Sequence, residues 1–220
     1  MKITLSDAGK RFNRDWIFRH LDYEFSTGTS YAITGPNGSG KSTLLQSIAG
    51  AIAISEGVIR YEGSDAGGGE APGLIPPDAA YRYLSLAAPY LQVVEEMTAL
   101  EFLHFHASFK PFLSGVLPID IIRRVGLEAA ADKQIRFYSS GMKQRVRLAQ
   151  ALFTDTPIVL LDEPCTNLDE EGISLYRELI AQYTAGRLVI VSSNDVQEYE
   201  FCTEKINIMG YKIPYGQKQV

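Results

Sequence analysis

The chain has 220 residues, of which 45% are hydrophobic, and a formal net charge of −5 at neutral pH. This length is enough to bury a substantial core as one large α/β domain, or as one domain with a subdomain. The negative balance argues against a nucleic-acid groove as the main function, so we expect no nucleic-acid partner. The first residues lack the pattern of a signal peptide, and no apolar stretch reaches the roughly 18 residues that span a bilayer. We therefore expect a soluble, cytoplasmic chain without direct membrane insertion.

Two strands and a glycine-rich loop are predicted near the N-terminus. Leu21, Tyr23 and Phe25 alternate with acidic residues, as in a half-buried strand, and residues 30–34 predict a more buried one. The following residues match the phosphate-loop pattern G-x-x-x-x-G-K-[ST] and lead into a helix that is predicted to end near Gly50. The order strand, loop, helix is the one that a phosphate loop requires.

This loop predicts a site for a nucleoside triphosphate. Its glycines let successive backbone N–H groups and the positive end of the following helix point at the β-phosphate. Lys41 is expected to reach the β- and γ-phosphates, and Ser42 offers its hydroxyl to Mg²⁺. The predicted ATP-binding residues of the loop are Gly35, Pro36, Asn37, Gly38, Ser39, Gly40, Lys41, Ser42 and Thr43.

The middle of the chain predicts a helical insertion between strands. Residues 57–62 read as a strand, residues 63–77 as a glycine- and proline-rich surface loop, and residues 81–86 as another strand. A capping box at Thr98 and Glu101 opens a helix that continues to about residue 109, and a second helix is predicted near 119–125.

A pair of carboxylates follows a buried strand in the second half of the chain. Residues 158–161 are all apolar and run directly into Asp162 and Glu163, as at the carboxyl end of a strand in a parallel sheet. Asp162 is expected to hold Mg²⁺, directly or through water. Glu163, which strand alternation would point the other way, is expected to act as the general base that polarises water for attack on the γ-phosphate.

Together with Tyr-Ser-Ser-Gly-Met-Lys-Gln-Arg at 138–145 and Thr-Asn-Leu-Asp at 166–169, these motifs give a resemblance over essentially the whole chain. The chain resembles the ATP-binding subunits of ABC transporters. The resemblance implies an α/β P-loop ATPase with a RecA-like core, an N-terminal antiparallel β subdomain and a helical subdomain at about 95–150. It implies a single domain over residues 1–220.

The resemblance also implies that the chain works in pairs. Ser139, Ser140 and Gly141 stand at the place of the family signature, which contacts the ATP bound by the opposite subunit, and Asp169 stands in the D-loop. The partner would be a second copy of the chain or a paralogous subunit. The signature departs from the commoner Leu-Ser-Gly-Gly-Gln and is similar to the Tyr-Ser-x-Gly-Met form frequent among exporter subunits, which favours export.

Three further positions follow from the resemblance. An aromatic residue that stacks on adenine is expected about thirty residues before the lysine, which selects Phe12, with Trp16 as the alternative. The place of the family's glutamine loop holds Pro89, so Gln92 is the nearby candidate for contact with the metal. Asn194 occupies the place of the family's histidine, so hydrolysis is expected to be slow or differently assisted.

The end of the chain carries two predicted elements. Residues 189–195 resemble the family's last core strand and the switch that follows it, and residues 210–216 read as a terminal hairpin with no regulatory domain after it.

The implied function is an ATP-hydrolysing subunit, with ATP and Mg²⁺ as cofactors, that dimerises on ATP. It would power transport of an unknown solute through a separate polytopic permease, at the cytoplasmic face of the membrane. The alternative is a soluble ABC-type ATPase that acts as an assembly or clamp factor without a permease.

Overall fold

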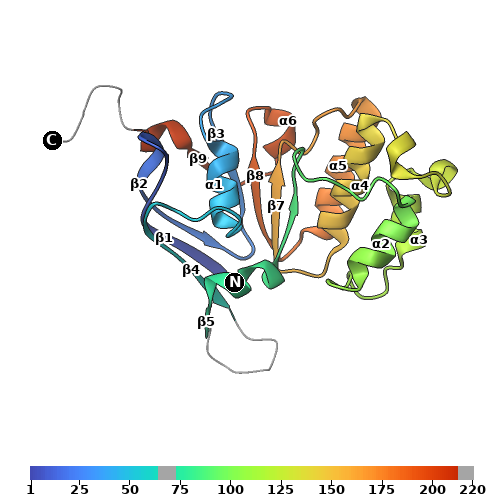
Figure 1. Ribbon diagram of the computed structural model, residues 1–220, viewed down its shortest axis with the longest axis horizontal. Helices are drawn as coiled ribbons and strands as arrows, with labels where there is room; N and C mark the ends of the chain where they lie inside the picture. Colours follow the sequence, from blue (N-terminus) through green and yellow to red (C-terminus); the bar gives the residue numbers. More distant parts are fainter. Residues whose placement is uncertain (64–72, 213–220) are drawn as a thin grey trace.

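The computed structural model describes residues 1–63 and 73–212. It contains two β-sheets, and the helices lie mainly around the larger one (Figure 1). The first sheet is antiparallel and the second is parallel, as predicted for an α/β ATPase with an N-terminal antiparallel part.

The antiparallel sheet has the strand order β2-β1-β4-β5. Leu21 and Phe25 are fully buried in it, which confirms the predicted half-buried strand. The segment predicted as a loop at 63–77 differs at its end, where residues 73–75 pair with β4; residues 64–72 lie outside the described residues. The strands are β1 (Lys2–Phe12), β2 (Asp15–Ser26), β4 (Glu56–Gly63) and β5 (Gly73–Ile75).

The parallel sheet has the order β6-β7-β8-β3-β9, so strands distant in sequence lie side by side. Strand β6 begins later than predicted, because Pro77 starts a 3-10 helix, Pro77–Tyr83, in a position that suits its fixed φ and missing N–H. The strands are β3 (Ser30–Thr34), β6 (Leu84–Ala87), β7 (Ile158–Asp162), β8 (Leu188–Ser192) and β9 (Glu204–Asn207).

The C-terminal part of the fold differs from the prediction in two ways. Strand β8 is not the last core strand, because β9 pairs with the opposite side of β3. The segment predicted as a hairpin at 210–216 begins within a 3-10 helix, Ile208–Tyr211, whose first turn is capped by the side chain of Asn207. Residues 213–216 lie outside the described residues.

Three of the helices, α2, α3 and α4, lie between β6 and β7 in the sequence and to one side of the sheet (Figure 1). The capping box is confirmed, since Thr98 Oγ1 accepts from the N–H of Glu101 and the Glu101 carboxylate accepts from the N–H of Thr98. None of the helices in the described ranges is long and apolar enough to cross a membrane. The helices are α1 (Lys41–Ile48), α2 (Ala99–Ala107), α3 (Pro118–Arg124), α4 (Ser140–Phe153), α5 (Glu170–Tyr183) and α6 (Val196–Tyr199).

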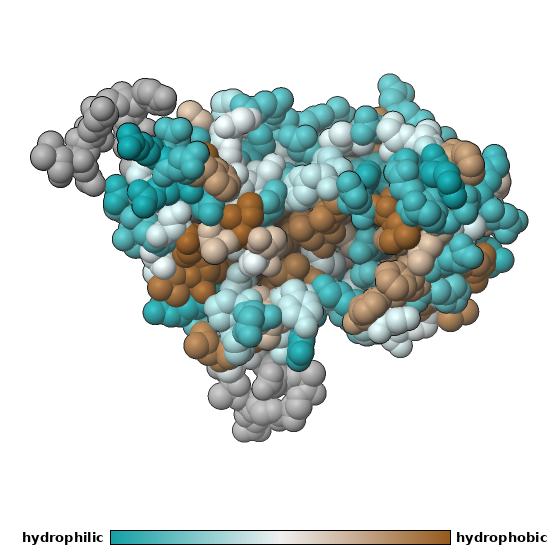
Figure 2. Space-filling view, in the orientation of Figure 1, coloured by the Kyte–Doolittle hydropathy of each residue, from teal (hydrophilic) through white to brown (hydrophobic). Residues whose placement is uncertain are grey.

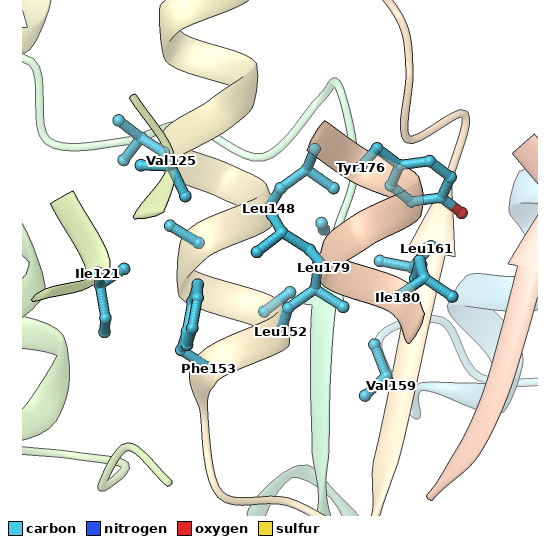
Figure 3. Close-up of a cluster of buried hydrophobic side chains, with 14 of the residues drawn as sticks. Ile121, Val125, Leu148, Leu152, Phe153, Val159, Leu161, Tyr176, Leu179 and Ile180 are labelled. Atoms are coloured by element: carbon cyan, nitrogen blue, oxygen red, sulfur yellow. The ribbon is translucent and has the colours of Figure 1, made fainter. Parts of the chain in front are cut away.

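Strand β7 is buried on both faces and contributes to two hydrophobic clusters. Ile158 and Leu160 pack in the cluster that joins the antiparallel sheet and α1, whereas Val159 and Leu161 pack with α4 and α5 (Figure 3). Such two-sided burial is typical of a strand inside a parallel sheet. It holds the end of β7, and therefore Asp162, at a fixed place on the carboxyl edge of the sheet.

Candidate nucleotide-binding site

The phosphate loop joins β3 to α1 in a conformation that needs glycine. Gly40, which caps α1, has φ of 101°, and a Cβ there would lie 2.2 Å from Cγ2 of Ile17. At Gly35, a Cβ would lie 2.8 Å from Oγ of Ser39. L-residues rarely adopt a left-handed φ, so both backbone strain and lack of space exclude side chains here. The start of β2 and the loop itself thus enclose a backbone cradle.

Lys41 lies inside this cradle and is only 4% exposed. Its Nζ donates to the carbonyls of Gly35 and Pro36, at 3.0 and 3.2 Å. An ammonium group has three donors, so one remains for an anion. Ser39 Oγ is also buried and has no hydrogen-bond partner among the described residues. The cradle therefore has the charge and the donors that a phosphate group requires.

Asp162 ends β7 beside this cradle and is 1% exposed. Burial raises the pKa of its carboxyl group, and the nearby Ser192 and Ser42 hydroxyls and the charge of Lys41 act in the opposite direction. Its Oδ1 has no hydrogen-bond partner in the part of the chain that the structure describes. The structure thus brings Lys41, Ser42 and Asp162 together. A carboxylate and a hydroxyl are oxygen ligands of the kind that Mg²⁺ prefers, so the residues present fit this ion.

Glu163 does not continue the strand. Its φ is 42°, in the left-handed region, and its N–H donates to the carbonyl of Ser192 at 2.9 Å. The prediction that strand alternation sets the direction of the Glu163 side chain is therefore wrong. Strand β7 ends at Asp162, and a left-handed turn directs this side chain instead. Such a backbone conformation is uncommon for a residue other than glycine and is held here by the bond to β8.

Asn194 lies at the end of the neighbouring strand. Strands β3 and β8 are paired with Ile33 opposite Ser192, and the N–H of Ser193 donates to the carbonyl of Ile33 at 3.1 Å. The chain at Asn194 therefore runs beside the start of the phosphate loop. The Asn194 side chain is exposed at this edge.

Of the two aromatic candidates for adenine, Phe12 has the more accessible ring. It ends β1 and is 46% exposed, with Lys10 Nζ at 4.8 Å from the ring centroid. Trp16 is stacked by the guanidinium groups of Arg19 and Arg11, at 4.5 and 5.6 Å. This arrangement favours Phe12.

The signature residues line a different hollow of about 390 Å³, here called the signature groove. Ser139 caps α4 by accepting from the N–H of Met142 at 3.2 Å, and Ser139 and Ser140 are both exposed. A Cβ on Gly141 would lie 2.9 Å from the carbonyl oxygen of Asn167, so the D-loop packs against the start of α4. The groove is lined by Gly126, Leu127, Ala129, Ala130, Ser139, Ser140, Gly141, Met142, Arg145, Asn167, Leu168 and Asp169.

No residue of the phosphate loop, which the structure describes in full, lines the signature groove. Asp169, the D-loop residue, caps α5 by accepting from the N–H of Gly172 at 2.8 Å, and Arg145 lies 3.6 Å from its carboxylate. The predicted residues therefore form two separate sites on this chain, one around Lys41 and one around Ser139.

Two residues near the first site were missed by the reasoning from sequence. Gln92 is exposed, whereas Tyr90 lies close enough to Asp162 that burial, together with the Asp162 carboxylate, raises the pKa of the Tyr90 phenol to about 12. The resemblance predicts an amide side chain in this segment, and Tyr90 has none. The signal that could have found it is the pairing of β6 with β7, which carries the chain past Asp162 directly after Ala87.

Glu198 is the second missed residue. It lies on α6, is 4% exposed, and its Oε1 accepts from the N–H of Cys165 at 2.7 Å. The hydroxyl of Tyr176 donates to its backbone carbonyl. Burial raises the pKa of Glu198 to about 7, partly offset by the hydroxyl of Ser193 and the N–H of Cys165. This buried carboxyl group joins the segment after Asn194 to the loop after Glu163.

Comparison with known proteins places these sites in a family. The sequence profile described as "ABC transporter" matches residues 18–166. An uncharacterised ABC transporter ATP-binding protein of Bacillus subtilis is 30% identical over 198 residues, which cover 89% of this chain and 87% of the relative. A cytochrome c biogenesis ATP-binding export protein of Nitrobacter winogradskyi is 32% identical over 182 residues, 80% of this chain and 83% of the relative.

The fold is shared with solved structures of the same family. A putative ABC transporter ATP-binding protein from Pyrococcus furiosus has a TM-score of 0.78 at 22% identity, with 97% of this chain and 100% of that chain covered. A dimeric bacterial ABC transporter cassette has a TM-score of 0.77 at 22% identity, with 94% of each chain covered. The chain therefore belongs to the ABC transporter family, as an ATP-binding cassette that hydrolyses ATP.

Proposed function

We propose that two copies of this chain, or this chain and a paralogous subunit, close on two molecules of ATP and power transport of a solute through separate membrane-spanning subunits. The observation that carries the proposal is the separation of two incomplete sites. Lys41 lies in a formed phosphate cradle, whereas Ser139 and Ser140 lie exposed in the signature groove. A second chain that presents its groove to this cradle would complete the site, and one similar bacterial cassette has been solved as a dimer.

In this proposal, the phosphate loop and Lys41 bind the β- and γ-phosphates, and Phe12 stacks on adenine. Ser42 and Asp162 hold Mg²⁺, which when bound neutralises charge on the phosphate oxygens. Glu163 accepts a proton from the attacking water, and Asn194 donates a hydrogen bond to the γ-phosphate.

The signature groove would act on the ATP held by the other chain. Ser139 and the N–H of Gly141 stand at the N-terminus of α4, a helix of 14 residues, where the macrodipole favours an anion. Asp169 lies beside them at the N-terminus of α5. Binding would thus bury the phosphates between two chains, and loss of the γ-phosphate would remove a contact that holds the chains together.

We further propose that residues 1–220 act as one ABC-type ATPase domain whose helical subdomain, about 95–150, meets a permease at the cytoplasmic face of the membrane. Phe105 and Phe109 on and after α2 are exposed, with ring centroids 5.1 Å apart. Figure 2 shows hydrophobic residues at the surface over the region of α2 and α3. An exposed apolar patch that includes two neighbouring aromatic rings is typical of a contact surface. The exporter-like signature and a relative named as an export protein support export.

The test of pairing uses Glu163→Gln, which removes the proposed base but keeps its shape, so that ATP binds without being cleaved. With ATP and Mg²⁺, the mass in solution should rise from that of one chain to that of two. The matched control carries Lys41→Ala as well and should stay monomeric. A Glu163→Gln protein that binds ATP yet stays monomeric at tens of micromolar, both alone and mixed with a paralogous cassette, would contradict the proposed pairing.

Transport is tested separately by fractionation. A transporter subunit should sediment with membranes and co-purify with a polytopic protein, whereas an assembly or clamp factor without a permease should stay in the soluble fraction.

A further inference from the structure

The chain turns back on itself directly after β7, at the residue proposed as the general base. The N–H of Thr166 donates to the carbonyl of Glu163 at 3.1 Å, so residues 163–166 form a β-turn. The centre of this turn is the peptide group between Pro164 and Cys165, and both residues are buried. A buried peptide group needs one partner for its carbonyl and another for its N–H.

Two buried side chains supply these partners. Gln144 on α4 is fully buried and donates from Nε2 to the carbonyl of Pro164 at 2.8 Å. Glu198 on α6 is almost fully buried, and its Oε1 accepts from the N–H of Cys165 at 2.7 Å. One peptide group is therefore bonded at both ends by side chains from two helices that are distant in sequence.

These two bonds fix the direction of the peptide group. Type I and type II turns differ in the orientation of their central peptide, so a turn of this length can exist with the peptide pointing either way. A flip here would turn the carbonyl of Pro164 toward the carboxyl group of Glu198 and the N–H of Cys165 toward the amide of Gln144. Acceptor would then face acceptor and donor would face donor, and unpaired buried polar groups are costly.

The direction of this peptide matters because Glu163 stands next to it in an uncommon conformation, with φ of 42°. Such a conformation persists where the surrounding structure determines it from several sides. The N–H of Glu163 donates to the carbonyl of Ser192 at 2.9 Å, and its own carbonyl accepts from Thr166. The backbone of Glu163 is thus held by β8 on one side and by the turn on the other.

Glu198 is itself held firmly. Its N–H donates to the carbonyl of Asp195 at 3.1 Å, and Asp195 caps α6 by accepting from the N–H of Gln197 at 3.0 Å. The hydroxyl of Tyr176, which is fully buried on α5, donates to the backbone carbonyl of Glu198 at 2.7 Å. The carboxyl group therefore starts from a fixed backbone, only four residues after Asn194.

We propose that Glu198 is a positioning residue for ATP hydrolysis: with Gln144 it holds the Pro164–Cys165 peptide and so sets the direction of the Glu163 carboxylate in its own chain. The inference rests on the proposed function, in which Glu163 accepts a proton from the attacking water. Glu198 does not contact the nucleotide in this proposal. Its loss should therefore slow the chemical step and leave ATP binding unchanged.

The experiment compares Glu198→Met with Glu198→Gln, which have similar length and differ in the acceptor oxygen. Misplacement of a catalytic group by about 1 Å can cost on the order of a hundredfold in rate. Hydrolysis at saturating ATP should fall by about 10–100-fold in Glu198→Met, whereas Glu198→Gln should keep most of the rate because its Oε1 can still accept from Cys165. ATP affinity, measured in a Glu163→Gln parent, should be the same with either substitution.

Thermal unfolding midpoints are recorded for each variant, and rates are compared well below the lowest midpoint. If Glu198→Met does not fold, Gln144→Met tests the same peptide from its carbonyl end and should lower the rate in the same way. A wild-type rate in the folded Met variant, or an equal loss in Glu198→Gln, would overturn this inference alone.

Mixing experiments test whether Glu198 acts within its own chain. Glu198→Met mixed with Ser139→Ala should recover activity, because the Ser139→Ala chain brings an intact loop and an intact Glu163 to the other chain's signature. Mixed with Lys41→Ala it should stay slow. Recovery only with Lys41→Ala would mean that Glu198 acts on the partner's ATP instead, and would overturn the inference. If Ser139→Ala and Lys41→Ala do not restore each other either, the proposed pairing itself fails.

Discussion

The phosphate loop and the signature groove are completed to different degrees within one chain. In the loop, Gly40 packs against Ile17 and Lys41 already has two carbonyl partners. In the groove, Ser139 and Ser140 are exposed. The hydroxyl of Ser139 caps its own helix by accepting from the N–H of Met142. The difference teaches that the chain preforms the half of the site that we propose binds phosphate, and leaves open the half that a second chain would use.

The largest expected effect comes from removing the cation of the preformed half. Lys41→Ala should lower ATP hydrolysis at least about a thousandfold and weaken ATP binding, because Lys41 is the one buried lysine among the residues that the structure describes. The fold should persist, since Lys41 bonds only to two carbonyls of its own loop. Hydrolysis, ATP binding and thermal unfolding are measured beside Lys133→Ala, an exposed control. Normal hydrolysis in Lys41→Ala would remove the phosphate-loop assignment.

The open half is tested by mixing two inactive proteins. Ser139→Ala should lower hydrolysis by about 10²–10³ through loss of one donor to the γ-phosphate, while ATP still binds to the same chain. Mixed with Lys41→Ala, it should recover activity, because the mixed pair contains one intact loop facing one intact signature. The control mixture replaces Lys41→Ala by the double variant and should stay inactive. If both mixtures are equally inactive, the groove does not serve the partner's ATP.

Glu198 is a buried residue on α6 that accepts from the N–H of Cys165, in the segment that leads from Glu163 to the D-loop. Burial raises its pKa from the ordinary value of 4.5 to about 7. The folded chain then holds this proton more tightly than the unfolded chain, so the free energy of unfolding should fall as the pH rises from about 4.5 to about 7. Glu198→Gln removes this titration and can still accept from the N–H of Cys165. We expect the variant to be more stable than the wild type at pH 8, by at most on the order of 3 kcal/mol, and less dependent on pH.

The measurement is urea-induced unfolding at pH 5 and pH 8. Glu200→Gln is the matched control, because Glu200 is exposed and pairs with Arg177 at 2.9 Å. Parallel pH dependences of the wild type and Glu198→Gln would show that the charge of Glu198 has no cost in the folded state.

The smallest expected effect is a gain at the edge of the preformed half. Asparagine can donate through its amide but is shorter than histidine and never cationic, so Asn194 should replace the family's donor only in part. We expect slow basal turnover and an increase of up to about tenfold at saturating ATP in Asn194→His, with ATP affinity unchanged. Asn194→Ala should turn over more slowly than the wild type. A wild-type rate of tens per second would mean that the missing donor is already supplied.

Much of the fold follows from local patterns in the sequence. The phosphate loop, the capping box at Thr98 and the buried strand before Asp162 are each defined by residues only a few positions apart. All three form as predicted. Strand β9 was missed because only Ile206 of its four residues is buried, so neither alternation nor an apolar run marks it. The late start of β6 follows from a 3-10 helix whose last three residues, Tyr81, Arg82 and Tyr83, alternate between aromatic and charged side chains as a strand would.

The candidate site shows the same limit more sharply. Its motif residues were found because each belongs to a short contiguous pattern. Tyr90 and Glu198 belong to none. Their positions depend on distant segments, since Tyr90 lies near Asp162 and Glu198 accepts from the N–H of Cys165. The direction of Glu163 depends on where β7 stops, which strand alternation alone does not give.

The distance of the signature groove from the chain's own phosphate loop has a consequence for enzymology. If each site needs two chains, turnover per chain should depend on protein concentration and fall on dilution below the dissociation constant of the pair. A permease that holds two cassettes would replace this bulk concentration by an effective concentration on the order of millimolar. Specific activity would then become independent of dilution, so the same polypeptide would follow second-order kinetics when free and first-order kinetics when assembled.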